Sequence, residues 1–241
     1  AGSAYTLEQI ITAGIENCKR ACAPYGALTA LDVGPLGELL EPSGTLAFED
    51  AVAEYARIVK AGEAAGADLI FFETYTDLYE LKAALLAAKE NTHLPILASM
   101  SFEAGGRTFT GCTVESFAAT ARGLGADAVG INCSLGPKEI FPMAKRLAEA
   151  VPGNFPVFVK PNAGLPRADG SGYDITPQLF ALQMKPYREL HLFAAGGCCG
   201  TTPEFIKLLN GTFAGCTPGR PAHRMPSVLC TPVDAVTVDG I

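Results

Sequence analysis

The sequence predicts an α/β protein of the TIM (β/α)8 barrel type, with about six of the eight βα units present. The chain has 241 residues, 49% of them hydrophobic, and roughly 250 residues is the size of one such barrel. Short apolar runs alternate with longer helical stretches, which is the order of a parallel sheet with right-handed crossovers. The apolar runs lack regular polar alternation, which is typical of strands buried on both faces.

The strands and helices are expected in strict alternation, after an opening helix. The apolar runs predicted as strands are 27–33, 68–73, 95–102, 126–133, 156–161 and 192–197. The stretches predicted as helices are 7–23, 48–65, 78–90, 114–124, 138–150, 177–184 and 203–209. Two helix starts have capping-box spacing, at Thr6/Gln9 and Asp77/Glu80, and two place a cap residue before a first-turn proline, at Thr176 and Thr202.

The strand count predicts an incomplete barrel. A closed barrel needs eight strands, so we expect residues 1–214 to form a barrel domain that lacks about two βα units at its front. Residues 215–241 are rich in Pro, Thr and Gly and end in a strand-like run at 234–238. They are predicted to be a linker that leads toward a further domain. An open six-stranded sheet is the alternative architecture.

Composition narrows the class of partner and compartment. The net charge is −7 and no basic cluster is present, which argues against nucleic acid and anionic membranes and favours a small-molecule substrate. No apolar run approaches the roughly 18 residues of a membrane span, and the N-terminus lacks a basic region before an apolar one. We therefore expect a soluble cytoplasmic protein, in which the 8 cysteines bind metal or react more readily than they form disulfides.

Three cysteines are expected to meet at one end of the barrel. Cys198 and Cys199 follow the last predicted strand, and Cys133 ends the strand two before it. Catalytic groups of such barrels collect at the C-terminal strand ends, where alternate strands supply the same layer. Three thiolates with an open fourth position are typical of catalytic zinc. Asn162 and Glu73, at the ends of two other strands, are expected over the same opening.

Each of these residues also has a purely structural interpretation. The alternatives for the adjacent cysteines are a redox pair or small buried residues, and the alternative for Asn162 is a residue that only stabilises a turn. Lys160 suggests a Schiff-base aldolase, although a lysine within a strand more often pairs with a carboxylate. Thr201 and Thr202 are first of all helix caps, with exposed N–H groups that suit a substrate carboxylate. The cysteines and histidines without metal spacing are Cys18, Cys22, Cys112, Cys216, Cys230, His93, His191 and His223.

Several motifs, taken together and in order, carry a family resemblance that covers nearly the whole chain. They are Gly-Ile-Asn-Cys-Ser-Leu-Gly-Pro at 130–137, Pro-Asn-Ala-Gly-Leu-Pro at 161–166, Gly-Gly-Cys-Cys-Gly-Thr-Thr-Pro-Glu at 196–204, Asp-Val-Gly-Pro-Leu-Gly-Glu at 32–38, Phe-Glu-Thr at 72–74 and Leu-Lys-Ala-Ala at 81–84. The chain resembles the homocysteine S-methyltransferase family, in particular the homocysteine-binding barrel of cobalamin-dependent methionine synthases. That family's first strand, with an Asp-Gly motif near the substrate, and its second strand are absent here.

The resemblance implies a zinc ion held by Cys133, Cys198 and Cys199, with the sulfur of homocysteine as fourth ligand. It implies that Asn162 can occupy the open position before substrate arrives, and that Glu73 contacts the substrate amino group. The substrate-binding residues it implies are Glu73, Asn162, Asn132 and Ser134. It also implies a methyl donor, methylcobalamin, on a separate domain, and a folate-binding domain after the linker.

The chemistry of such a site follows from charge. A free thiol is only a few per cent thiolate at neutral pH, and zinc bound to sulfur removes the proton. Three cysteine thiolates over-neutralise Zn²⁺, so a fourth sulfur is held loosely and stays nucleophilic. Such a sulfur can attack a methyl group, and the family resemblance implies that the acceptor is homocysteine and the product methionine. The alternatives are a betaine or sulfonium donor, and an inactive or binding-only zinc module.

Overall fold

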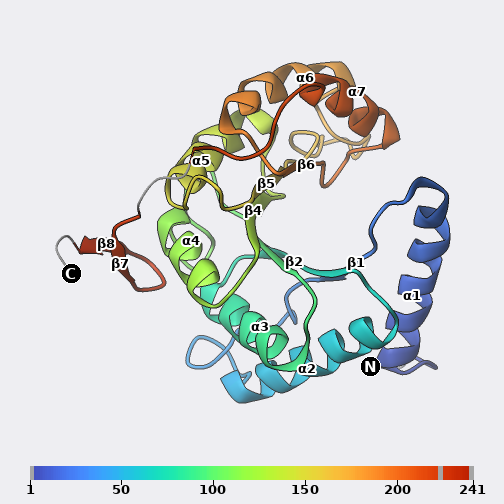
Figure 1. The fold of residues 1–241 in the computed structure, drawn as a ribbon, viewed down its shortest axis with the longest axis vertical. Coiled ribbons are helices and arrows are strands. Elements are labelled where there is room, and N and C mark those ends of the chain that lie inside the picture. Colours follow the sequence, from blue (N-terminus) through green and yellow to red (C-terminus); the bar gives the residue numbers. More distant parts are fainter. Residues whose placement is uncertain (1–2, 222–224, 239–241) are drawn as a thin grey trace.

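The computed structural model describes residues 3–221 and 225–238, and its centre is a parallel sheet of six strands in sequence order (Figure 1). The sheet curves so that its helices lie along the convex side. This half-barrel agrees with the incomplete, six-stranded barrel that the strand count predicts. Every predicted strand is present, although each except the second is shorter than expected. The strands are β1 (Ala30–Val33), β2 (Leu69–Tyr75), β3 (Ile96–Met100), β4 (Ala128–Asn132), β5 (Val157–Lys160) and β6 (Ala194–Ala195).

The helices also follow the predicted order. They are α1 (Leu7–Cys22), α2 (Phe48–Ala64), α3 (Leu78–Asn91), α4 (Val114–Gly123), α5 (Pro137–Glu149), α6 (Pro177–Met184) and α7 (Pro203–Phe213), with short 3₁₀ turns η1 (Ala23–Tyr25) and η2 (Lys185–Leu190). The capping box at Thr6 and Gln9 is confirmed. Thr176 caps α6 by accepting a hydrogen bond from the Leu179 N–H at 3.3 Å.

Two of the predicted helix caps are wrong in detail. Asp77 caps α3 through the Tyr79 N–H at 3.1 Å, but Glu80 does not complete a capping box. The Glu80 carboxylate is buried and instead accepts hydrogen bonds from the Leu36 N–H at 2.7 Å and the Tyr55 hydroxyl at 2.9 Å. Long-range partners have thus displaced the local one. Thr202 occupies the cap position of α7, but its hydroxyl makes no capping hydrogen bond.

The two faces of the sheet are packed differently. The face toward the helices is a closed apolar core, in which Ile70, Phe72 and Val129 are fully buried. The concave face carries polar and charged groups at the C-terminal strand ends, with aromatic rings below them. Gly130 makes room for one of these rings, because a Cβ atom there would lie 2.2 Å from the ring of Phe158. The functional side chains therefore stand on a rigid, well-packed support.

The C-terminal segment forms a structured hairpin beside the barrel. The strand expected at 234–238 is confirmed as β8 (Ala235–Val238), and it pairs antiparallel with β7 (Ser227–Cys230), which the sequence analysis missed. The hairpin packs against α4. Arg107, in the loop before α4, donates from Nη1 to the Val233 carbonyl oxygen at 2.8 Å. The described part of this segment therefore includes a folded hairpin, and its role as a linker toward a further domain stays a prediction.

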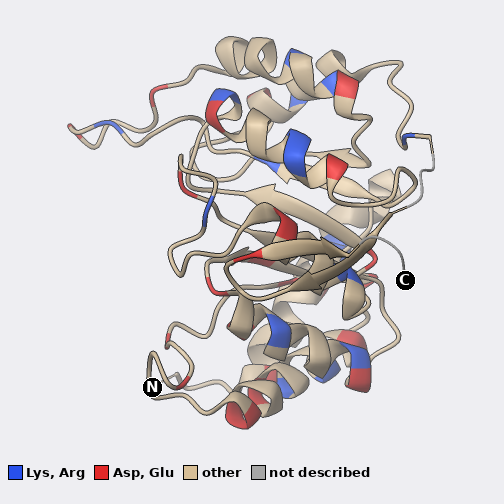
Figure 2. Ribbon diagram, turned by 90° about the vertical axis from the view of Figure 1, so that its left-hand side faces the viewer, with Lys and Arg blue, Asp and Glu red and all other residues tan. Residues whose placement is uncertain are grey.

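The charged residues are interspersed over the helices and loops rather than gathered by sign (Figure 2). Among the helices in the described ranges, none combines the length and the apolar character that a membrane span requires.

Candidate metal and substrate site

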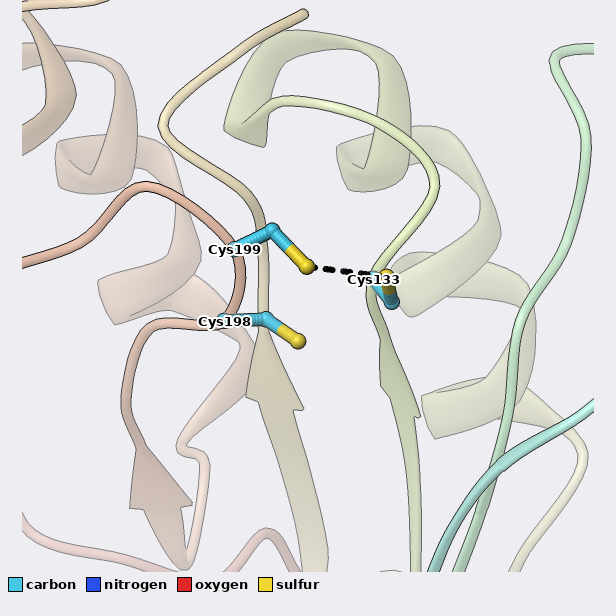
Figure 3. Close-up of side chains that lie close together, drawn as sticks. All are labelled: Cys133, Cys198 and Cys199. Atoms are coloured by element: carbon cyan, nitrogen blue, oxygen red, sulfur yellow. Dashed lines mark hydrogen bonds between the residues drawn. The ribbon is translucent and has the colours of Figure 1, made fainter. Parts of the chain in front are cut away.

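The three cysteines singled out by the sequence meet at the C-terminal ends of β4 and β6 (Figure 3). Cys133 follows β4 directly, and Cys198 and Cys199 lie in the turn between β6 and α7. The Sγ atoms of Cys133 and Cys199 are 3.7 Å apart, and all three sulfur atoms lie within 4.8 Å of one another. Residues separated by 66 positions are thus brought together by the register of the sheet.

The backbone of the β4 end turns sharply to present Cys133. Cys133 and Ser134 both adopt left-handed conformations, with φ of 64° and 61°, which non-glycine residues rarely do. The turn is fixed because the Cys133 N–H donates to the Lys160 carbonyl oxygen on β5 at 3.1 Å. Such uncommon backbone geometry persists only where the surrounding structure holds it, and it is concentrated at functional sites.

The end of β5 braces the adjacent cysteines. Cys199 donates its N–H to Asn162 Oδ1 at 3.0 Å, and its carbonyl oxygen accepts from the Ala163 N–H at 2.9 Å. The Cys198 N–H donates to the Pro161 carbonyl oxygen at 2.8 Å. Asn162 is buried, so in this arrangement its carboxamide oxygen stabilises the turn, as the structural interpretation of this residue expects.

The donor set and spacing fit a tetrahedral zinc ion. Zinc–sulfur bonds of about 2.3 Å in a tetrahedron place neighbouring sulfur atoms about 3.8 Å apart, close to the 3.7 Å between Cys133 and Cys199. Cys133 and Cys198 are half-buried while Cys199 is exposed. The cluster thus has one side toward solvent, where a fourth ligand can enter.

The thiols of the cluster influence one another. A hydrogen bond from Cys198 lowers the pKa of Cys133 to about 7. The same contact, followed by burial, raises the pKa of Cys198. One sulfur of the metal-free cluster therefore ionises near neutrality while its neighbour keeps its proton. Metal binding must then displace protons, since only deprotonated sulfur is a good zinc ligand.

Charged side chains occupy the concave face next to the cysteines. Glu73 pairs with Lys160, and both side chains are largely buried, with exposures of 16% and 25%. The Lys160 ammonium also lies 4.5 Å from the ring centroid of Phe71. The prediction that Lys160 pairs with a carboxylate is therefore confirmed, and its amino group is not free in the way a Schiff-base lysine requires.

Two residues near the site were missed by the sequence analysis. Partial burial and the charge of Glu73 raise the pKa of Asp32, and the charge of Lys160 opposes this increase. Asp32, Glu73 and Lys160 therefore form one group of charged side chains, the charged cluster.

The second of these residues, Tyr173, lies over the cysteine turn. A Cβ atom at Gly200, where φ is 79°, would lie 2.3 Å from the Tyr173 ring. Burial and the nearby Cys199 sulfur raise the pKa of Tyr173. The only sequence signal for it was the glycine-rich loop before it.

The remaining predicted residues are placed as follows. Ser134 is exposed beside Cys133, whereas Asn132 is fully buried behind it. Thr201 donates its hydroxyl proton to the Cys198 carbonyl oxygen at 2.7 Å. Cys18 and Cys22 have sulfur atoms 3.8 Å apart on α1, but no third metal-ligating residue joins them in the described part of the chain. His223 falls outside the described residues.

Comparison with known proteins gives one consistent family. The sequence model described as homocysteine S-methyltransferase matches residues 1–213. Methionine synthase of Mycobacterium leprae is 35% identical over 162 residues, which is 64% of this chain and 13% of the relative. That of Mycobacterium tuberculosis is 35% identical over 172 residues, 68% of this chain and 14% of the relative. The chain therefore spans about one seventh of the length of these relatives.

Solved structures show the same fold. The apo form of the homocysteine methyltransferase MmuM from Escherichia coli superposes with a TM-score of 0.71 at 22% identity, covering 88% of this chain and 76% of that one. Its metallated form gives a TM-score of 0.66 at 24% identity, covering 85% of this chain and 70% of that one.

Proposed function

Because this chain belongs to the homocysteine S-methyltransferase family, we propose that it binds zinc through Cys133, Cys198 and Cys199 and transfers a methyl group to the thiol of homocysteine. The product is methionine. The observation that carries the proposal is the convergence of three sulfur atoms within 4.8 Å of one another at the strand ends, with one side of the cluster exposed. Three thiolates and one open position are the donor set of a catalytic rather than a closed structural zinc site.

The residues around the cysteines have distinct parts in this proposal. Glu73 provides the negative charge that attracts the substrate ammonium. The positive charge of its partner Lys160 reduces the repulsion between the carboxylates of Glu73 and Asp32. Ser134, exposed beside Cys133, contacts the substrate. Asn162 accepts the hydrogen bond from the Cys199 N–H before substrate binds, and it contacts the substrate afterwards.

The reaction is a nucleophilic substitution at the methyl carbon. The homocysteine thiol loses its proton to solvent, its sulfur forms a bond to the methyl carbon, and the methyl–donor bond breaks with its electron pair remaining on the donor. When bound, zinc keeps the substrate sulfur in the thiolate form at neutral pH. The half-barrel positions this sulfur at the mouth of the sheet, from which a donor must approach in line.

The relatives suggest the rest of the assembly. Both are methionine synthases of which this chain spans 13% and 14%. We propose that residues 1–214 are the homocysteine-binding barrel domain and that the following segment leads toward a folate-binding domain. Methylcobalamin on a separate domain is then the methyl donor. We propose a cytoplasmic location, in agreement with clustered free cysteines.

Zinc-edge X-ray absorption of the zinc-loaded protein, with and without homocysteine, tests the proposal. We expect a fourth sulfur to join the zinc when homocysteine is added. Homoserine, in which a hydroxyl replaces the thiol, is the matched control and should leave three sulfurs. Unchanged coordination with homocysteine would contradict a catalytic zinc site.

Assays with different methyl donors distinguish the proposed donor from the alternative donors and from a binding-only module. If a fourth sulfur joins the zinc, methylcobalamin, betaine and a sulfonium donor can each be supplied with homocysteine while methionine is measured. Methionine from methylcobalamin supports the proposal, and methionine from betaine or the sulfonium compound supports the alternative donors. Coordination without turnover from any donor would identify a binding-only module.

A further inference from the structure

Asn132 is a buried residue, called the hub below, whose side chain forms hydrogen bonds both to the cysteine cluster and to the strand end that carries Glu73. Its side chain is 0% exposed at the end of β4. Its Oδ1 accepts hydrogen bonds from the Thr74 N–H at 2.9 Å and from the Ser99 hydroxyl at 2.8 Å. Its Nδ2 donates to Thr74 Oγ1 at 2.8 Å and to Cys198 Sγ at 3.8 Å. These contacts use both donors and both lone pairs of the carboxamide, which leaves no group for a substrate.

One side of this hub holds an uncommon backbone conformation. Thr74 has a φ of 68°, which is a genuine outlier for a β-branched residue. It lies where the register between β2 and β3 shifts, between Phe72 and Tyr75. Asn132 bonds both the N–H and the hydroxyl of Thr74, so it stabilises this turn directly. Because Thr74 follows Glu73, the turn sets the direction of the Glu73 carboxylate.

The other side of the hub faces a proposed metal ligand. An N–H bond to a cysteine sulfur draws negative charge from it and fixes its direction. Contacts of this kind behind a metal ligand typically change metal affinity by 10–100-fold, roughly, when they are removed. The main chain of Asn132 is fixed as well, since its carbonyl oxygen accepts the Ser101 hydroxyl at 2.8 Å. Cys133 is the next residue, so the hub orients two of the three cysteines.

We propose that Asn132 is a positioning residue that couples the cysteine cluster to Glu73. Its carboxamide sets the charge and orientation of the Cys198 sulfur and, through Thr74, the direction of the carboxylate that attracts the substrate ammonium. This replaces the direct substrate contact implied by the family resemblance with a role behind the site. The inference rests on the proposed zinc and homocysteine function.

The test uses Asn132→Asp in the full chain, loaded with Co²⁺ in place of zinc. The aspartate keeps the shape and the Oδ1 acceptor but loses the N–H donor to sulfur. We expect a shift of the sulfur-to-cobalt charge-transfer band, a change of about 10–100-fold in metal affinity, and weaker homocysteine binding. Ser99→Ala is the matched control. It removes a hydrogen bond from the same carboxamide without touching sulfur, so it should leave the cobalt band in place.

Thr74→Val separates the effect of Asn132 on Glu73 from its effect on the Cys198 sulfur. It also tests the proposal if the Asn132 variant does not fold. It removes the hydroxyl that Asn132 bonds, so it should weaken homocysteine binding while the cobalt band stays close to that of the wild type. Unchanged homocysteine affinity in Thr74→Val, or an unchanged cobalt band in a folded Asn132→Asp, would overturn the coupling.

The wild-type measurements distinguish failure of this inference from failure of the proposed function. If wild-type protein binds Co²⁺ but not homocysteine, the proposed function is wrong. The band shift of Asn132→Asp still decides whether Asn132 acts on Cys198.

Discussion

The surface at the strand ends has two halves, which hold their functional side chains close together in different ways. On the half formed by β4 to β6, three sulfur atoms converge and are held mainly through backbone hydrogen bonds from neighbouring strand ends. On the half formed by β1 to β3, Glu73 pairs with Lys160 and Asp32 feels both of these charges. Glu80, on the following helix α3, is buried against Leu36 and Tyr55. Cys133 and Cys198 tolerate close contact because one ionises near neutrality while the other keeps its proton. The carboxylates of Glu73 and Asp32 repel each other, and Lys160 offsets this repulsion.

This difference separates the expected effects of substitution. A ligand lost from the sulfur half should remove the metal, whereas a carboxylate lost from the other half should weaken substrate binding or shift the pH dependence of stability and leave the metal in place. Four measurements test this division, from the largest expected effect to the smallest.

The largest effect is expected for Cys133→Ala or Cys198→Ala. Each removes one of three proposed ligands, so zinc should fall from about one ion per chain to near zero and methyl transfer should be lost with it. Metal analysis and a methionine assay on the same samples check this. Cys18→Ala, which removes a sulfur of the α1 pair, is the matched control and should retain both. Full zinc occupancy in either site variant would refute the three-ligand assignment.

Removal of the metal from the wild-type protein should lower its stability. Anything that binds only the folded state stabilises it by mass action, by about 4 kcal/mol when free zinc is a thousandfold above its dissociation constant. The melting temperature should therefore fall on chelation and recover on adding zinc. The Cys198→Ala variant should show no such response, and an equal response there would place the stabilising metal elsewhere.

An intermediate effect is expected for Glu73→Gln on the carboxylate half. Hydrogen bonds to charged groups contribute about 1.5–3 kcal/mol, so homocysteine affinity should fall roughly 10–150-fold. Zinc content should stay at the wild-type level. Titration with homocysteine checks the affinity, and Glu103→Gln, an exposed loop glutamate, is the control. Loss of zinc in Glu73→Gln would show that the two halves are not separable.

The smallest effect is expected for Glu80→Gln, and it depends on pH. Burial raises the pKa of Glu80 above its ordinary value, so the folded protein holds this proton more tightly than the unfolded chain does. The contribution to stability is therefore fully present below the unfolded pKa, about 4.3, and is lost as pH rises through the folded pKa.

Glutamine cannot ionise, and its oxygen can still accept the bonds from Leu36 and Tyr55. The stability of Glu80→Gln relative to wild type should therefore increase as the pH rises from 4 to 7. Denaturant unfolding at several pH values measures it, with Glu90→Gln on the exposed side of α3 as control. A relative stability that falls with pH would contradict a raised pKa.

Local chemistry explains which predictions from the sequence succeeded. Helix starts at Thr6 and Thr176 depend on neighbours within three residues, and they are confirmed. The predicted capping box at Glu80 is wrong because its carboxylate found partners at Leu36 and Tyr55, which are 44 and 25 residues away. The hairpin strand β7 was missed because it is only four residues long and is paired with β8 alone.

The sequence by itself determined the order of strands and helices, the six-stranded half-barrel and the three cysteines, because apolar periodicity and strand-end position are local properties. Only the tertiary structure decided how these residues are held. The left-handed turns at Thr74, Cys133 and Ser134, the pairing of Glu73 with Lys160 and the buried carboxamide of Asn132 all depend on contacts between different strands. Such contacts depend on the sheet register, which places distant residues within hydrogen-bonding distance.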